Sequence, residues 1–231
     1  MPFAYQTAAS RAHVGRGAVH HHYTITQAHS TMTIISEWLE DYSAARRTAA
    51  ITARLLRRQL QEQVRHGERP AVLLHWCELQ PPAIAVPSAV AACTLLRRKD
   101  VRRLHIHDWF QGKATSVTQS KTGHPVDLPP IRCQFKAEEL AGAAVYAVDH
   151  MSARTADRMR TRAWNAVGVR THHARKTCLH MVRHVYATWA AWCGQSMEEI
   201  GDVLGHGTAE ATATYIHSIN HLFTEEARKG L

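Results

Sequence analysis

Apolar residues recur at helical spacing along most of this chain. Two stretches, Thr33 to Tyr42 and Thr48 to His66, have this spacing, and Gly67 with Pro70 just beyond gives the second a stop signal. Residues 1–30 lack the pattern and carry a run of three histidines, so they predict a flexible leader. We therefore expect helices from about residue 31 onward.

A third helix is predicted from Ser88 to about Leu104, and it carries one charge on its apolar face. The residues of that face recur at spacings of four and three, and they are Val90, Thr94, Arg97, Val101 and Leu104. A charged side chain is rarely placed inward without a partner or a ligand. Arg97 is thus a candidate functional residue, and the alternative is a structural arginine paired with Asp100.

A small hairpin is predicted after this helix. His105 to Asp108 and Ala114 to Gln119 have short-strand character, and residues 121–124 form a turn before Val126 and Leu128. The hairpin places Lys121 near its tip. With helices resuming near Ala137, the predicted fold class is mainly α with a small antiparallel β hairpin, or α+β.

The C-terminal third predicts helices that bring several polar side chains into order. From about Lys176 to Cys193, His180 and Arg183 lie three residues apart on one helix edge, so both can face one target. The apolar stripe of that helix is Leu179, Val182, Tyr186, Trp189 and Cys193. Ser196 and Glu199 form a capping box for a short helix that ends at Leu204 and Gly205, which leaves His206 in a loop. Thr208 is expected to cap a last helix that carries Tyr215.

The composition is that of a globular protein, and the positive net charge is compatible with nucleic-acid binding but does not establish it. The 231 residues are 45% hydrophobic, and 28 Lys and Arg oppose 19 Asp and Glu, for a net charge of +9. The five cysteines are scattered, so they predict small core residues in a reducing interior, not a disulfide framework or a zinc site. We found no signal peptide or membrane span, so a cytoplasmic location is expected.

The order and spacing of the candidate residues resemble the catalytic domain of tyrosine recombinases, the phage integrase family. The segment His180-Met181-Val182-Arg183-His184, then Leu204-Gly205-His206, then Tyr215-Ile216-His217, is similar to that family's H-x-L-R-H, L-G-H and Y-x-H motifs. Upstream, Thr94-Leu95-Leu96-Arg97 and Gln119-Ser120-Lys121-Thr122-Gly123 resemble its first arginine motif and its lysine hairpin. The resemblance covers about residues 87–222 and implies a catalytic domain at 69–231, behind a short helical segment at 31–68 that corresponds to a reduced core-binding domain.

The resemblance implies site-specific DNA recombination or integration within a mobile genetic element. Arg97 and Arg183 would grip the scissile phosphate with their planar forks, and His206 would donate a further hydrogen bond to it. His180 would act as acid or base near the nucleophile Tyr215, and Lys121 would protonate the leaving 5′-oxygen. The product would be a 3′-phosphotyrosyl link, with no metal or ATP required. Double-stranded DNA and a homotetramer on it are the implied partners.

Several features leave alternatives open. Leu95 stands where the family has Gly, Asp100 stands where it has Glu, and the N-terminal part is short for a DNA clamp. A truncated recombinase acting as a DNA-binding regulator is therefore one alternative, and a type IB topoisomerase-like enzyme is another. A histidine-rich metal-binding protein is a third, although no ligand set has suitable spacing. A basic helix with Arg54, Arg57, Arg58 and Arg65 is either a phosphate-contacting surface or a solvated one.

Overall fold

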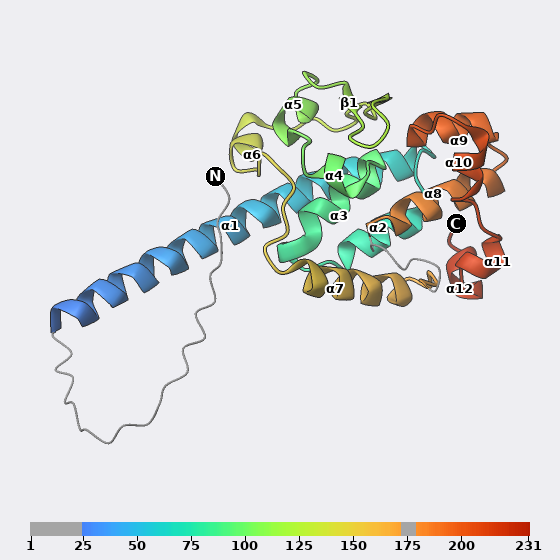
Figure 1. The fold of residues 1–231 in the computed structure, drawn as a ribbon. Helices are drawn as coiled ribbons and strands as arrows, with labels where there is room; N and C mark the ends of the chain where they lie inside the picture. Colours follow the sequence, from blue (N-terminus) through green and yellow to red (C-terminus); the bar gives the residue numbers. More distant parts are fainter. Residues whose placement is uncertain (1–24, 172–178) are drawn as a thin grey trace. The chain divides into compact units, whose positions relative to one another are not determined.

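A computed structural model describes residues 25–171 and 179–231 as a mainly helical chain with one small antiparallel sheet (Figure 1). This confirms the predicted α+β composition. The N-terminal elements are α1 (Ile25–Arg65), α2 (Ala71–Glu78), α3 (Pro82–Thr94), α4 (Arg98–Val101), α5 (Ile106–Phe110), β1 (Ser116–Thr118) and β2 (Pro125–Asp127). The C-terminal elements are α6 (Ala137–Ala141), α7 (Ala153–Ala166), α8 (Met181–Trp192), α9 (Met197–Leu204), α10 (Ala209–Ala213), α11 (Ile219–Leu222) and α12 (Glu225–Arg228).

The two helices predicted before residue 67 are one helix, α1. Residues 42–231 form one compact unit, which includes the C-terminal part of α1. Helix α1 also begins at Ile25, inside the predicted leader, while residues 1–24 with the histidine run lie outside the described residues. The link between the predicted helices contains alanines and arginines and no glycine or proline, and these residues favour helix without needing an apolar face.

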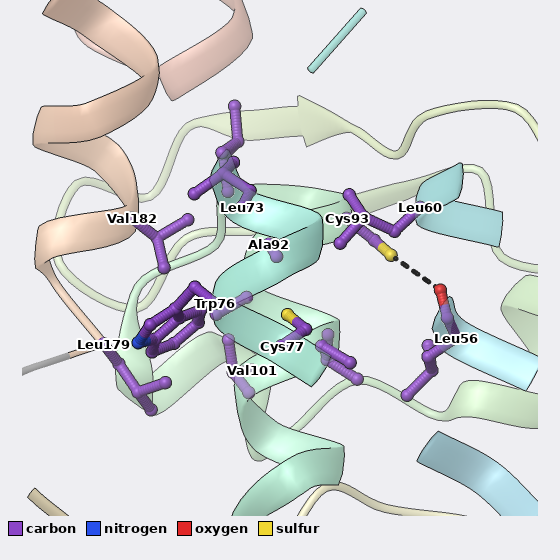
Figure 2. Packing of buried hydrophobic residues seen from close by; sticks show 14 of the residues in the cluster. Leu56, Leu60, Leu73, Trp76, Cys77, Ala92, Cys93, Val101, Leu179 and Val182 are labelled. Carbon is purple, nitrogen blue, oxygen red and sulfur yellow. Dashed lines mark hydrogen bonds between the residues drawn. The ribbon is translucent and has the colours of Figure 1, made fainter. Parts of the chain in front are cut away.

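The core of the second unit is built around α2 and α3. Figure 2 shows Leu56 and Leu60 of α1 near Cys93 of α3, whose thiol donates to the Leu56 carbonyl at 3.4 Å. Trp76 of α2 stacks on Trp164 of α7 with ring centroids 4.1 Å apart. The cysteine prediction was right for Cys77 and Cys93, which are buried; Cys133 is half-buried, Cys193 is exposed, and Cys178 lies outside the described residues.

The single helix predicted from Ser88 to Leu104 was wrong. Helix α3 starts at Pro82, since proline is favoured in the first turn, and it ends at Thr94. Leu95 then takes a left-handed conformation, with φ of 57°, and ends the helix. Arg97 is consequently not on a helical face: it lies in extended backbone as the N-cap of α4.

The hairpin was predicted correctly and the strand before it was not. β1 pairs antiparallel with β2, Val117 opposite Val126, and Lys121 lies in the turn between them. His105 to Asp108 enters helix α5 instead of a strand. The His105 ring accepts a hydrogen bond from the Asp108 backbone N–H, which caps the helix at short range where periodicity could not reveal it.

The C-terminal helices position the candidate residues. The capping box of Ser196 and Glu199 on α9 is confirmed, as is the left-handed cap at Gly205, with φ of 65°. The predicted helix from Lys176 begins later among the described residues, at Met181, so His180 is its N-cap. Thr208 caps α10, but that helix ends at Ala213, so the prediction that it carries Tyr215 was wrong.

The end of the chain forms α11 and α12 and packs against its own unit. Phe223 forms an antiparallel bridge with Val169, the residue after Gly168 at the end of α7, and both side chains are buried. The Thr224 N–H donates to the Gly168 carbonyl at 2.8 Å. The Phe223 N–H still donates to the Ile219 carbonyl at 3.0 Å, but the extended backbone of Phe223 ends α11 before α12 begins. None of the described helices is long and apolar enough for a membrane span.

Candidate functional site

Arg183 on α8 is buried and bonded to the ends of two other helices. Its side chain is 1% exposed. One nitrogen, Nη1, donates to the Leu95 carbonyl at 2.7 Å, and the other, Nη2, donates to the Leu204 carbonyl at 2.8 Å. These carbonyls lie at the C-terminal ends of α3 and α9, where helix geometry leaves acceptors without partners and the dipole is negative. The guanidinium therefore fastens three helices at one point.

The segment Leu204-Gly205 also fixes the hairpin. Gln119, just after β1, donates from Nε2 to the same Leu204 carbonyl at 3.0 Å, so that oxygen accepts from both Gln119 and Arg183. A Cβ added to Gly205 would lie 2.2 Å from Val126 and 2.3 Å from the Gln119 amide. Glycine is thus required at this position for close packing as well as for its positive φ. Together these contacts place Lys121 on a turn anchored to α9.

His206 follows directly and contacts the same guanidinium. Its Nε2 lies 2.7 Å from Arg183 Nη2, and its Nδ1 lies 3.1 Å from the Thr212 hydroxyl. Because a guanidinium has only donors, Nε2 must be the acceptor in this pair. In this structure His206 therefore accepts from Arg183, whereas the sequence resemblance implies that it donates to a phosphate.

The ring of Tyr215 lies among the other candidate side chains. The Arg183 guanidinium carbon lies 5.1 Å from its centroid. His180 meets the ring edge-on at 5.1 Å between centroids, and His206 lies tilted at 4.7 Å. His184 stacks on it at 4.7 Å with 28° between planes. The structure therefore brings together four of the six residues predicted from sequence.

His184 was interpreted from the sequence as a packing residue, and the structure places it in the ring cluster. Besides stacking on Tyr215, its Nδ1 lies 2.9 Å from Nε2 of His217. The available signal was its spacing: residues four apart share a helix face, and His184 is four after His180. His217 follows the tyrosine by two residues in the Y-x-H motif, which placed it close by in sequence.

The three histidines around Tyr215 are neutral at neutral pH. The pKa of His180 falls to about 4, first because burial disfavours the charged ring and then because Arg183, Arg97 and Lys121 repel it. Burial and neighbouring charges also lower the pKa of His206 to about 4.

The pKa of His184 falls to about 4 as well, through burial and then the neighbouring His180 and His217. Neutral imidazoles can accept protons, which is the state a base beside a tyrosine needs.

Arg183 is charged despite burial, which lowers its pKa to about 10. Tyr215, when ionised, opposes that effect, and Arg97 adds to it. Among the described residues no carboxylate lies within ion-pair distance of the guanidinium, and its buried Nε has no hydrogen-bond partner. Asp100 favours the charged form from a distance, but a buried cation with a spare donor and no directly paired carboxylate is a candidate to meet an anion.

Arg97 lies beside this cluster, and the alternative pairing with Asp100 is wrong. The Asp100 carboxylate is buried and accepts from the Ser120 backbone N–H at 2.9 Å, next to Lys121. The buried Nη1 of Arg97 has no hydrogen-bond partner in the described chain. Asp100 therefore orients the hairpin, and Arg97 keeps a donor for another group. Lys121 itself is exposed on its turn.

The basic helix that the sequence offered as a phosphate-contacting surface is partly engaged within the chain. In α1, Arg58 pairs with Glu139 at 2.9 Å, and Arg54 approaches the same carboxylate at 4.0 Å. Arg65 pairs with Glu62 at 2.6 Å. These pairs favour the solvated-surface interpretation of the helix.

Chemically, the cluster combines a phenol hydroxyl, neutral imidazoles that can accept protons, and guanidinium groups that retain unpaired donors. Three of the five N–H groups of Arg183 are used by Leu95, Leu204 and His206, and the buried Nε–H has no hydrogen-bond partner in the described chain. Within the described residues, no group of three or more His, Cys, Asp or Glu side chains is placed to hold a metal ion. Comparison with models of protein families, with curated proteins and with solved structures gives no significant match.

Proposed function

We propose that this chain is a tyrosine recombinase catalytic domain that cleaves and rejoins double-stranded DNA. The observation that supports this most is the position of Tyr215 against Arg183, a buried guanidinium with spare donors and no carboxylate partner. A phosphodiester is an anion whose charge grows on its oxygens during attack, so it matches a pre-formed cation of this kind.

In the proposed reaction the Tyr215 oxygen attacks the phosphorus and the bond to the 5′-oxygen breaks. Arg183 and Arg97 bind the non-bridging oxygens, and neutral His180 accepts the phenol proton. Lys121, exposed on its turn, supplies a proton to the 5′-oxygen. The phosphotyrosyl bond conserves the energy of the broken ester, so a 5′-hydroxyl of a second strand reverses the steps. Strand exchange then requires several copies of the chain on DNA, with a tetramer as the expected assembly.

A second candidate function is a DNA-binding regulator that no longer cleaves. One observation favours it: His206 accepts from Arg183 and so is not set to donate to a phosphate. Leu95, in a left-handed conformation that glycine adopts at lower cost, adds strain beside the same site. We prefer the recombinase because histidine can be reprotonated when an anion arrives, without moving the backbone.

The deciding experiment traps the covalent intermediate. A library of nicked duplexes with randomised sequence is incubated with the protein, so that loss of the short 5′-hydroxyl fragment prevents religation. Adducts are isolated on denaturing gels and their DNA is sequenced. We expect an adduct with the wild type and none with Tyr215→Phe.

The matched control is Tyr186→Phe on α8. That phenol bonds Gln195 at 3.4 Å and is not among the rings that contact Tyr215, so the adduct should persist. DNA binding without any adduct from the wild type would favour the regulator, and an adduct from Tyr215→Phe would rule out Tyr215 as the nucleophile.

A further inference from the structure

A chain of hydrogen bonds runs from Arg183 through His206 to a buried hydroxyl that no motif singled out. Arg183 Nη2 donates to His206 Nε2 at 2.7 Å, and His206 Nδ1 lies 3.1 Å from Thr212 Oγ1. With Nε2 accepting, a neutral imidazole must carry its proton on Nδ1. The ring therefore donates to Thr212.

The Thr212 hydroxyl is oriented to accept a hydrogen bond from the His206 Nδ1–H. It donates its own hydrogen to the Thr208 carbonyl, one turn earlier, at 3.4 Å, which leaves its lone pairs for His206. Thr212 is fully buried, so water does not compete for this hydroxyl. All donors in the chain thus point the same way, from the guanidinium towards a backbone carbonyl of the loop before α10.

Gly201 on α9 provides the space for this hydroxyl. A Cβ added there would lie 2.9 Å from Thr212 Oγ1, closer than side chains tolerate. Glycine inside a helix costs about 1 kcal/mol relative to alanine, so its presence needs a packing reason. The close approach of Thr212 is such a reason.

We infer that Thr212 is a positioning residue that acts together with Arg183 to keep the proton of neutral His206 on Nδ1. In the opposite tautomer, Nε2–H would face a guanidinium donor, and the Nδ1 lone pair would face the hydroxyl lone pairs. With Nδ1 held on Thr212, Nε2 accepts from Arg183 in the free protein and can take up a proton to become a donor when a phosphate arrives. The consequence for catalysis rests on the proposed function; the tautomer does not.

The test reads the His206 ring directly by long-range ¹H–¹⁵N NMR of the full chain, with His206→Gln to assign its signals. We expect the Nδ1–H tautomer in the wild type and in Thr212→Ser, which keeps the hydroxyl. Thr212→Val, close in shape, should lose the preference by up to about tenfold in tautomer ratio. Unchanged ring signals in Thr212→Val, or an Nε2–H tautomer in the wild type, would overturn the inference.

A second variant reaches the same hydroxyl from the other side. Gly201→Ala raises helix propensity but presses on Thr212 Oγ1, so it should shift the tautomer as Thr212→Val does while the protein remains folded by circular dichroism. If both variants keep the wild-type tautomer, Thr212 does not set it.

Adduct formation separates this inference from the proposed function. We expect Thr212→Val to slow it by about tenfold and Thr212→Ser to restore it. Normal NMR behaviour without any wild-type adduct would refute the recombinase and leave the role of Thr212 standing. A normal adduct rate in Thr212→Val alongside a shifted tautomer would overturn the catalytic consequence alone.

Discussion

Two buried arginines, Arg160 on α7 and Arg183 on α8, have opposite surroundings. Arg160 is 0% exposed; it pairs with Asp149, whose side chain is 4% exposed, and approaches Asp157 at 3.6 Å. Its Nε donates to the Ser88 hydroxyl at 3.0 Å. Arg183 is equally buried, but its partners are two carbonyls and a histidine ring.

The difference separates structural burial of charge from functional burial. Arg160 has its counterions within the fold, so its charge is neutralised before any ligand arrives. No carboxylate pairs directly with Arg183, and although Asp100 favours its charged form from a distance, burial still lowers its pKa to about 10. Such an arrangement marks a candidate site for an external anion.

The largest expected effect comes from Arg160→Met. Removing the guanidinium leaves the buried Asp149 carboxylate without its main partner, and breaking a buried pair costs about 3 to 5 kcal/mol. Arg183→Met removes a cation that has no directly paired carboxylate. The Leu95 carbonyl loses its side-chain donor, while the Leu204 carbonyl still accepts from Gln119. The free energy of unfolding should therefore fall by only about 1 to 2 kcal/mol. Urea denaturation of both variants measures this; equal losses would contradict the distinction.

Acidification should destabilise the fold through the histidines that lie near Arg183. The pKa values of His180, His184 and His206 are about 4 in the folded chain, against an ordinary value of about 6.5. The unfolded chain therefore binds more protons between these values, so their contribution is complete above about pH 6.5 and is lost as pH falls towards 4.

Because solvent screens these half-buried rings, we expect the free energy of unfolding to fall by about 2 kcal/mol over this pH range. Denaturant midpoints measured from pH 7.5 to 4 test this. Replacing His180 or His184 by Gln should flatten the curve, and a curve unchanged by either replacement would refute the assignment.

Inorganic phosphate should stabilise the wild type through Arg183. Binding to the folded state alone adds about 1 kcal/mol when phosphate exceeds its dissociation constant several-fold. Thermal unfolding with phosphate or chloride at equal ionic strength measures the effect, with Arg183→Met as the variant that should lose it. Arg98→Met is the control. It removes a different cation, which forms an ion pair with Asp157 at a distance of 3.3 Å, and it should retain the stabilisation by phosphate.

The smallest expected effect lies at Leu95, whose carbonyl Arg183 binds. Its φ of 57° is unfavourable for a residue with a Cβ, yet its side chain is 1% exposed in the core. Leu95→Gly and Leu95→Ala both lose packing, but only glycine relieves the backbone, so Leu95→Gly should be the more stable by about 1 kcal/mol. Equal stability in urea would mean that the conformation is unstrained.

Predictions from the sequence were correct for caps and turns, whose conformation depends on residues that are neighbours along the chain. The capping box at Ser196, the stop at Gly205 and the turn at Lys121 depend on residues within a few positions of one another. Local reading failed where an unusual residue ended a helix. Leucine itself gives no signal for a left-handed cap, although the resembled motif has glycine at position 95. The predicted helix is therefore two helices, and Arg97 is not on the predicted face.

By itself the sequence determined the α+β composition, the hairpin and the order of the candidate residues, because these follow from periodicity, capping and turn residues close together in the chain. Only the tertiary structure decided which charges are compensated. The partners of Arg183 lie 88 and 21 residues away, and they are backbone carbonyls that any residue could supply. Spacing cannot encode such partners, because a carbonyl becomes a free acceptor only where a folded helix ends.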